Sequence, residues 1–163
     1  MKKFVKLATT LVAVLFVVAC SGSKNKEESR LVEPPKPVTA TFSYGYSVSS
    51  DLFKATTIDV YFTDASGKEV HEKMTTTSWS KQLKDVKPSF VGKMRIVYTL
   101  VQDFEPTRAQ HTFSTTYKLA YETTAGSSDL NDKSNSMTLS KNMVKGYLEA
   151  FVKEPYIYSL EVK

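Results

Sequence analysis

The sequence has few of the residues from which metal sites and covalent cross-links are built. It contains one cysteine and two histidines in 163 residues. One cysteine excludes an intramolecular disulfide, and these three residues are too few for a four-ligand structural zinc site. The chain also lacks a His-Glu-x-x-His zinc motif, a phosphate-binding Gly-x-x-x-x-Gly-Lys-Ser/Thr loop and a dinucleotide-binding Gly-x-Gly-x-x-Gly turn. We therefore predict no cofactor and no metal.

Clustered positive charge is missing as well, although the net charge is +5. Three of the 22 basic residues, Lys2, Lys3 and Lys6, lie at the very start. From Cys20 onward the chain holds 19 basic and 17 acidic residues, and from residue 38 onward it holds 15 and 14. A nearly neutral body without a basic face argues against nucleic acid as a partner.

The first twenty residues have the layout of a secretory signal. A basic start is followed by an apolar run from Leu11 to Ala19, which is shorter than the roughly 20 residues that a membrane-spanning helix needs. The end of this run, Val17-Val18-Ala19-Cys20, resembles the lipobox of bacterial lipoproteins. The resemblance implies cleavage before Cys20 and attachment of lipid to its thiol, so that the membrane itself becomes a partner. Durable anchoring requires two or more acyl chains, which this family carries.

The residues after Cys20 predict where the anchor lies and what it holds. Ser21 at the next position resembles the pattern of lipoproteins that are sorted to the outer membrane. Lys26-Glu27-Glu28 weakly resembles the acidic stretch that directs lipoproteins of some anaerobic Gram-negative bacteria to the cell surface. We therefore expect lipid anchoring at the outer membrane, on its periplasmic or cell-surface face. Residues 20–37 are polar and end in three prolines, which predicts a flexible tether. The expected organisation is a signal peptide at 1–19, a lipidated tether at 20–37 and one domain at 38–163.

Alternating apolar residues dominate the domain. Every even-numbered position from Val38 to Val48 is apolar. Residues 56–63 repeat the pattern before a turn from Asp64 to Gly67. This period of two predicts half-buried strands. Residues 68–77 complete a hairpin, and further strands are expected at 79–86, 93–102, 110–122 and 156–162.

One segment has a different period. After a polar stretch at 123–136, read as a loop, the apolar residues from Met143 to Val152 follow helical spacing. Ser140 is expected to be the N-cap of this helix. Leu139 and Val144 are expected to contact each other across it as a hydrophobic staple. Six or seven strands with one helix before the last predict a mainly β fold, an antiparallel two-sheet sandwich of immunoglobulin-like or transthyretin-like outline. The run from Ile58 to Val70 and the later Trp79-Ser-Lys also resemble small β-sandwich lipoproteins of Gram-negative anaerobes, most of which have no assigned activity.

Residues for catalysis do not form a recognisable set. His71 and His111 are expected to be exposed strand residues, and neither lies near a nucleophile signature. Asp103 and Glu105 adjoin Pro106 in a predicted turn, and the Asp129–Asp132 stretch lacks the glycine and terminal glutamate of a calcium loop. We therefore expect that the protein is not an enzyme.

Aromatic residues are the remaining candidates for binding. Most should fill the core, but Tyr61 lies between the buried positions of its strand, and Phe53 and Phe104 lie near turns. Trp79 opens a strand and is expected to plug the core or an edge. These four residues are the candidate binding aromatics, for a protein or glycan partner.

The sequence is consistent with three functions. The leading one is a lipid-anchored protein with a binding or envelope-assembly role. The second is a small carbohydrate-active or peptide-hydrolysing lipoprotein, which would need converging carboxylates or a histidine dyad. The third is a fimbrial or assembly protein that pairs through an edge strand.

Overall fold

A computed structural model describes residues 36–163 of the chain. The predicted signal peptide, Cys20 and nearly all of the predicted tether lie outside these described residues. Residues 36–163 form one compact unit, and every residue of its hydrophobic core lies between Ala40 and Val162.

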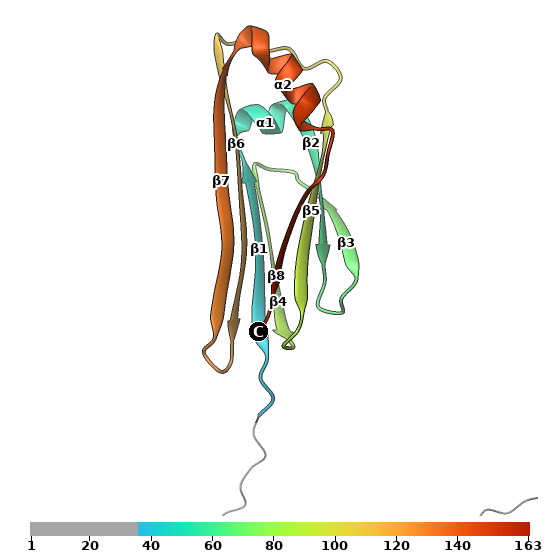
Figure 1. The fold of residues 1–163 in the computed structure, drawn as a ribbon. Coiled ribbons are helices and arrows are strands. Elements are labelled where there is room, and N and C mark those ends of the chain that lie inside the picture. Colours follow the sequence, from blue (N-terminus) through green and yellow to red (C-terminus); the bar gives the residue numbers. More distant parts are fainter. Residues whose placement is uncertain (1–35) are drawn as a thin grey trace, which may run out of the picture. The chain divides into compact units, whose positions relative to one another are not determined.

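Two four-stranded antiparallel sheets form this unit (Figure 1). The first, sheet A, has the order β4-β1-β6-β7, and the second, sheet B, has the order β3-β2-β5-β8. The strands of sheet A are β4 (Ser78–Val86), β1 (Ala40–Val48), β6 (Gln110–Thr123) and β7 (Ser128–Ser140). Those of sheet B are β3 (Glu69–Lys73), β2 (Thr56–Thr63), β5 (Val91–Leu100) and β8 (Tyr156–Glu161). The predicted fold class, a mainly β two-sheet sandwich with a helix before the last strand, is confirmed.

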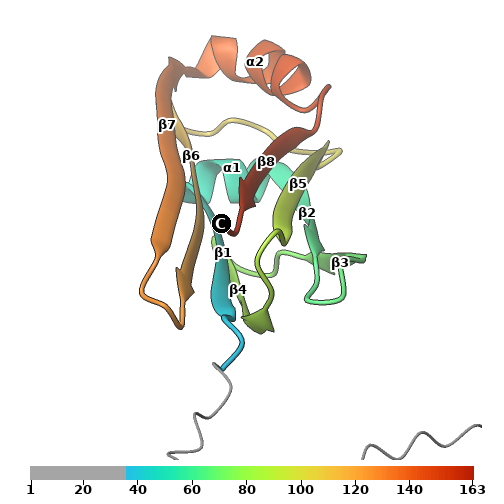
Figure 2. The same ribbon diagram turned by 60° about the horizontal axis from the view of Figure 1, so that its bottom comes forward.

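Two helices lie at the same end of the sandwich, which we call the helical end (Figures 1 and 2). Helix α2 (Val144–Phe151) connects β7 to β8, and a short 3-10 turn at Lys141–Met143 precedes it. Helix α1 (Ser50–Ala55) connects β1 to β2 and was not predicted, because six residues are too few to show a helical period. The hydroxyl of Ser49 caps α1 by accepting a hydrogen bond from the N–H of Leu52, over 3.3 Å.

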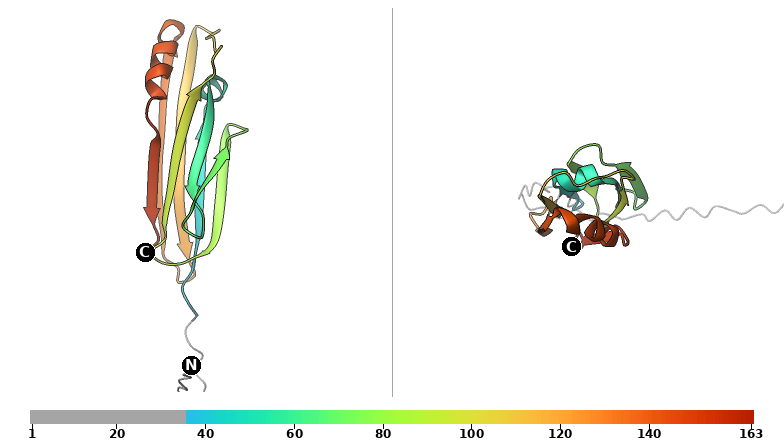
Figure 3. Two further views of the ribbon diagram at one scale, coloured as in Figure 1. Left: turned by 90° about the vertical axis from the view of Figure 1, so that its right-hand side faces the viewer. Right: turned by 90° about the horizontal axis from the view of Figure 1, so that it is seen from above.

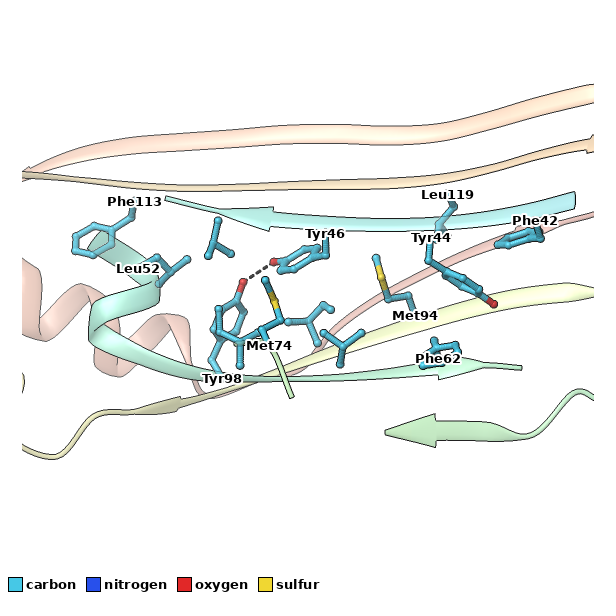
Figure 4. Close-up of a cluster of buried hydrophobic side chains, with 14 of the residues drawn as sticks. Phe42, Tyr44, Tyr46, Leu52, Phe62, Met74, Met94, Tyr98, Phe113 and Leu119 are labelled. Carbon is cyan, nitrogen blue, oxygen red and sulfur yellow. Dashed lines mark hydrogen bonds between the residues drawn. The ribbon is translucent and has the colours of Figure 1, made fainter. Parts of the chain in front are cut away.

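The inner faces of the sheets follow the predicted alternation closely. In β1 and β2 every second residue is buried, from Ala40 to Val48 and from Thr56 to Phe62. Val38 was expected to continue this pattern, but it precedes β1 and is 41% exposed. Figure 4 shows the core between the sheets, where the hydroxyls of Tyr46 and Tyr98 are hydrogen-bonded to each other.

Two local predictions for the segment before α2 were wrong. Residues 128–140, most of which were read as a loop, form β7, a 13-residue strand paired with β6 along its whole length. The side chain of Ser140 does not cap the helix; its hydroxyl hydrogen-bonds the amide oxygen of Asn142 over 2.6 Å. The segment was misread because β7 is an edge strand whose side chains are mostly exposed, so no apolar residue is required at alternate positions.

Candidate functional site

The two long sides of the sandwich are closed in different ways. On the β3–β4 side, the indole N–H of Trp79 donates to Glu72 Oε2 over 2.8 Å, and the ammonium of Lys81 donates to Glu72 Oε1 over 2.7 Å. Glu72 belongs to sheet B, whereas Trp79 and Lys81 belong to sheet A. The Trp79 ring also packs 5.3 Å from Phe62, so this side is sealed by one indole and one carboxylate.

The β7–β8 side is sealed only toward the end that lies away from the helices. There the ring of Tyr117 stacks on Tyr158 with 3.8 Å between centroids, and its hydroxyl donates to Asn131 Oδ1 over 3.0 Å. The amide of Asn131 in turn donates to the carbonyl of Ser159 over 3.0 Å, which links β7 to β8.

Between Asn131 and the buried Leu139, β7 presents inward-facing side chains that remain exposed. Asn135 and Met137 lie directly opposite Thr115 and Phe113 of β6, so all four share the inner face of sheet A. Phe113 is 2% exposed, but Met137 is 46% exposed although it faces the same way. The interior of the sandwich is therefore open to solvent at this level, between β7 and the segment formed by α2 and β8.

A cleft of about 550 Å³ occupies this opening. Figures 2 and 3 show its frame, with α2 crossing the helical end and β8 continuing from it along the same side. Aromatic rings form a continuous wall: Tyr147 lies 5.6 Å from Phe113 and 5.5 Å from Phe151, and Phe151 lies 5.1 Å from Tyr156. The remaining lining residues are Leu52, Thr115, Asn135, Ser136, Met137 and Ala150.

The lining of the cleft is electrically neutral. It includes no acidic or basic side chain. Burial raises the pKa of Tyr147, and burial together with the neighbouring Tyr147 phenol raises the pKa of Tyr156. Both phenols are therefore protonated at neutral pH, and that of Tyr156 donates to the carbonyl of Phe151 over 3.3 Å. The cleft can hold a neutral apolar or aromatic group, but its lining supplies no general acid or base for neutral pH.

A broader depression of about 750 Å³ lies on sheet A, and it is a poorer candidate. Its lining is largely polar and strand-borne, with Thr41, Ser43, Gln82 and Lys118 among its residues. Specific small-molecule sites are mostly apolar and concave, which describes the cleft under α2 and not this depression.

Tyr61, the first of the predicted binding aromatics, lies on the outer face of sheet B. The Arg95 guanidinium lies 3.8 Å from the centre of its ring, and His71 stacks on the ring with 4.7 Å between centroids. His71 is exposed, as predicted, and contacts Asp59 Oδ1 at 2.7 Å, while Arg95 pairs with Glu69 at 2.7 Å. The faces of Tyr61 are thus occupied by neighbouring side chains of this chain.

The other three predicted aromatics, Trp79, Phe53 and Phe104, are partly buried and pack against the core. None of the four lines the cleft under α2. Their role in binding stays a prediction.

His111 was expected to be exposed, and this was wrong. It is 5% exposed, because it shares the inward phase of Phe113 on β6 and lies between Phe104 and Asp51 of α1. Its Nε2 accepts the backbone N–H of Arg108 over 3.3 Å, and its Nδ1 lies 3.5 Å from Asp51 Oδ2. This arrangement holds the 103–109 segment against α1, and it is not a nucleophile–base pair.

The wall of the cleft was missed because its residues were assigned to the core. Tyr147 and Phe151 are four residues apart on α2, and Tyr156 follows Pro155. A signal was present: this apolar helix face follows a stretch of 13 largely polar residues, which cannot cover it with apolar side chains.

The fold and the cleft define the structural class of the protein: an antiparallel β-sandwich with an aromatic cleft at one side. No protein-family model, curated protein or solved structure that we compared with the chain matches it. Within residues 36–163, no group of three or more histidine, cysteine or acidic side chains is placed to hold a metal ion. Neither helix of this region is long and apolar enough to cross a membrane.

Proposed function

We propose that this protein is a lipid-anchored, non-enzymatic binding protein of the outer membrane, and that the cleft under α2 is its binding site. The observation that carries the proposal is the exposure of Asn135 and Met137 on the inner face of β7. A sandwich of this size normally fills its interior, yet Asn135 and Met137 face an aromatic wall and remain exposed.

The chemistry of the cleft supports binding over catalysis. Aromatic rings provide large apolar area, and tyrosine hydroxyls add fixed hydrogen-bond donors, a combination enriched in protein-binding sites. A hydrolase would instead require a carboxylate pair or a histidine base facing the substrate. The lining of the cleft contains neither of these.

The sequence Val17-Val18-Ala19-Cys20 supports the anchoring half of the proposal. The thiol of Cys20 is the atom to which lipid would be joined, so no other residue can replace it. We expect metabolic labelling with a palmitate analogue to mark the wild-type chain and not the Cys20→Ser variant. Labelling of Cys20→Ser, with retention in the membrane fraction, would contradict the anchor.

The binding half is tested in intact cells by site-specific photo-cross-linking. A benzophenone amino acid at Ala150, which lines the cleft, should cross-link an envelope component upon irradiation. The same amino acid at Glu149, the adjacent exposed position outside the cleft, is the matched control. A third probe at Tyr61 tests the outer face of sheet B. Cross-links from Tyr61 alone would place binding on that face and refute the cleft.

A further inference from the structure

We infer that the cleft and the free edge of β7 together bind an extended segment of a partner protein, which pairs with β7 as an added antiparallel strand and inserts alternate apolar side chains into the cleft. This inference rests on the proposed binding function of the cleft and specifies the chemistry of its partner.

The direction of the main-chain groups of β7 follows from the two ends of its ladder. The N–H of Thr123 donates to the carbonyl of Ser127 over 2.8 Å, and the N–H of Lys141 donates to the carbonyl of Ala109 over 3.0 Å. Both pairs belong to the same register that places Phe113 opposite Met137. Hydrogen-bonded pairs alternate along an antiparallel ladder, so the odd-numbered residues of β7 bond to β6.

The even-numbered residues of β7 therefore direct their N–H and C=O groups away from β6. One of them provides an independent check: the N–H of Leu130 is bonded by the carboxylate of its neighbour Asp129, over 2.8 Å. That amide has taken a side-chain partner because it is outside the ladder with β6.

Beside the cleft, the residues with outward-directed main-chain groups are Ser134, Ser136 and Thr138. Their side chains lie on the outer face of sheet A, where the hydroxyl of Ser134 bonds Thr116 over 2.8 Å and that of Thr138 bonds Thr112 over 3.0 Å. From Ser134 to Ser140 the strand contains no charge and no proline, the devices that usually protect a sheet edge from pairing. This part of β7 is thus a straight, unprotected edge that adjoins an apolar cleft.

The register predicts the side-chain pattern of the added strand. Its residues opposite Asn135 and Met137 face the aromatic wall, so they should be apolar, and those opposite Ser134 and Ser136 should be polar. Lys133 shares the inward phase with Asn135 and forms no ion pair within residues 36–163. Charge complementarity therefore favours an acidic residue opposite Lys133. For an antiparallel strand, the pattern is apolar-x-apolar-x-acidic.

Two segments of this chain fit the cleft less well. An antiparallel second copy of β7 in the register that pairs Ser136 with Ser136 would direct Lys133 and Asn135 inward together with Met137. In the predicted tether, Leu31 and Val32 are adjacent and would face opposite sides of a strand. Pro34, Pro35 and Pro37 carry no N–H to donate.

The test uses the full chain in lipid nanodiscs and a fluorescent synthetic peptide, Thr-Thr-Phe-Thr-Val-Thr-Glu-Thr-Thr. We expect its binding to raise the fluorescence anisotropy and to slow hydrogen exchange at the amides of Ser134, Ser136 and Thr138. A peptide with serine in place of Phe and Val, and nanodiscs without protein, are the controls. Ser136→Pro removes one outward N–H and should weaken binding about tenfold, whereas Ser136→Thr and the distant Leu130→Pro should not.

A second pair of variants does not depend on proline. Ala150→Phe fills the cleft and should weaken peptide binding about tenfold, whereas Glu149→Phe, outside the cleft, should leave it unchanged.

Three results would overturn the inference. Equal affinity of Ser136→Pro and wild type would show that side chains enter the cleft without strand pairing. If the peptide fails to bind while cross-links from position 150 persist, the pairing of an added strand with β7 is refuted. The proposed function of the cleft is not affected by that result. A dimer that forms without peptide and is lost in Ser136→Pro would identify a second copy as the occupant.

Discussion

At the scale of single residues, Gly92 of β5 shows how tightly the closed part of the sandwich is packed. It lies on the inner face of sheet B, and a Cβ at this position would overlap the ring of Phe42. Phe42 has no exposed surface and packs against Tyr44 and Phe90, with 4.8 and 5.3 Å between ring centroids (Figure 4 shows Phe42 and Tyr44). The ring therefore has little space into which it can move.

We predict that Gly92→Ala lowers the free energy of unfolding by about 1–3 kcal/mol, the usual cost of overpacking a dense core. Urea denaturation followed by circular dichroism measures this change. An unchanged midpoint and slope would show that the Phe42 ring moves aside without cost.

Gly146 of α2 is the matched case with the opposite expectation. A Cβ there meets no atom within 4 Å, and the residue is exposed. We predict that Gly146→Ala raises the free energy of unfolding by about 0.5–1 kcal/mol, because alanine loses less backbone entropy in a helix. The same denaturation experiment measures it, and a destabilised variant would contradict the placement of this residue in the helix.

Single residues also show where the sequence was informative. The alternation from Ala40 to Val48 predicted the buried face of β1, because one face of that strand lies in the core between the sheets. The same rule, applied to His111, would have shown that it shares the phase of Phe113. The prediction gave its polarity more weight than its phase. The N–H of Arg108 compensates for the burial of Nε2, whereas Nδ1 forms no hydrogen bond within residues 36–163.

At the scale of elements, β7 marks the limit of periodicity as a signal. A strand shows apolar alternation only where something covers one of its faces, and on the inner face of β7 only Leu139 is buried. Its stability comes from the ladder with β6 and from hydroxyl pairs such as Thr112–Thr138. The cleft exists for the same reason. The polar sequence of β7 therefore prevented the prediction of both the strand and the cleft.

Two proline variants of adjacent residues test the direction of the β7 main chain. Asn135→Pro removes an N–H that bonds β6, so we expect the free energy of unfolding to fall by about 1–3 kcal/mol. Ser136→Pro removes an N–H at the free edge, where proline is tolerated, so we expect a loss below about 1 kcal/mol. Urea denaturation of both variants gives the comparison. The reverse order would show that the ladder has the other phase, and equal losses would contradict the expected difference between the two N–H groups.

At the scale of the whole molecule, a set of tyrosines couples the two sheets. The phenol of Tyr46 from sheet A is hydrogen-bonded to that of Tyr98 from sheet B, and these two residues are 2% and 4% exposed. Burial raises the pKa of both phenols far above the ordinary value of 10.0, and the neighbouring Tyr46 adds to the effect on Tyr98. Burial also raises the pKa of Tyr158, to about 12, and Tyr158 stacks on Tyr117.

These raised pKa values predict that the protein loses stability in alkali. Well below pH 10 the phenols are protonated in both states, so they contribute no pH dependence. As the pH approaches and passes 10, the unfolded chain releases phenol protons that the folded chain retains, and the free energy of unfolding falls as the pH rises. Each fully buried tyrosine contributes up to about 1.4 kcal/mol per pH unit in this range. Urea denaturation at a series of pH values from neutral to alkaline measures the slope.

The matched control is the double variant Tyr46→Phe/Tyr98→Phe. It removes both hydroxyls of the Tyr46–Tyr98 hydrogen bond together, so neither is left without the other, and its stability at neutral pH should stay close to that of wild type. Its loss of stability above pH 10 should be shallower, because two of the groups that release protons on unfolding are gone. The same slope in the variant and the wild type would mean that other groups cause the alkaline transition. The hydroxyl pair would then be a packing contact and not the proton-linked connection between the sheets.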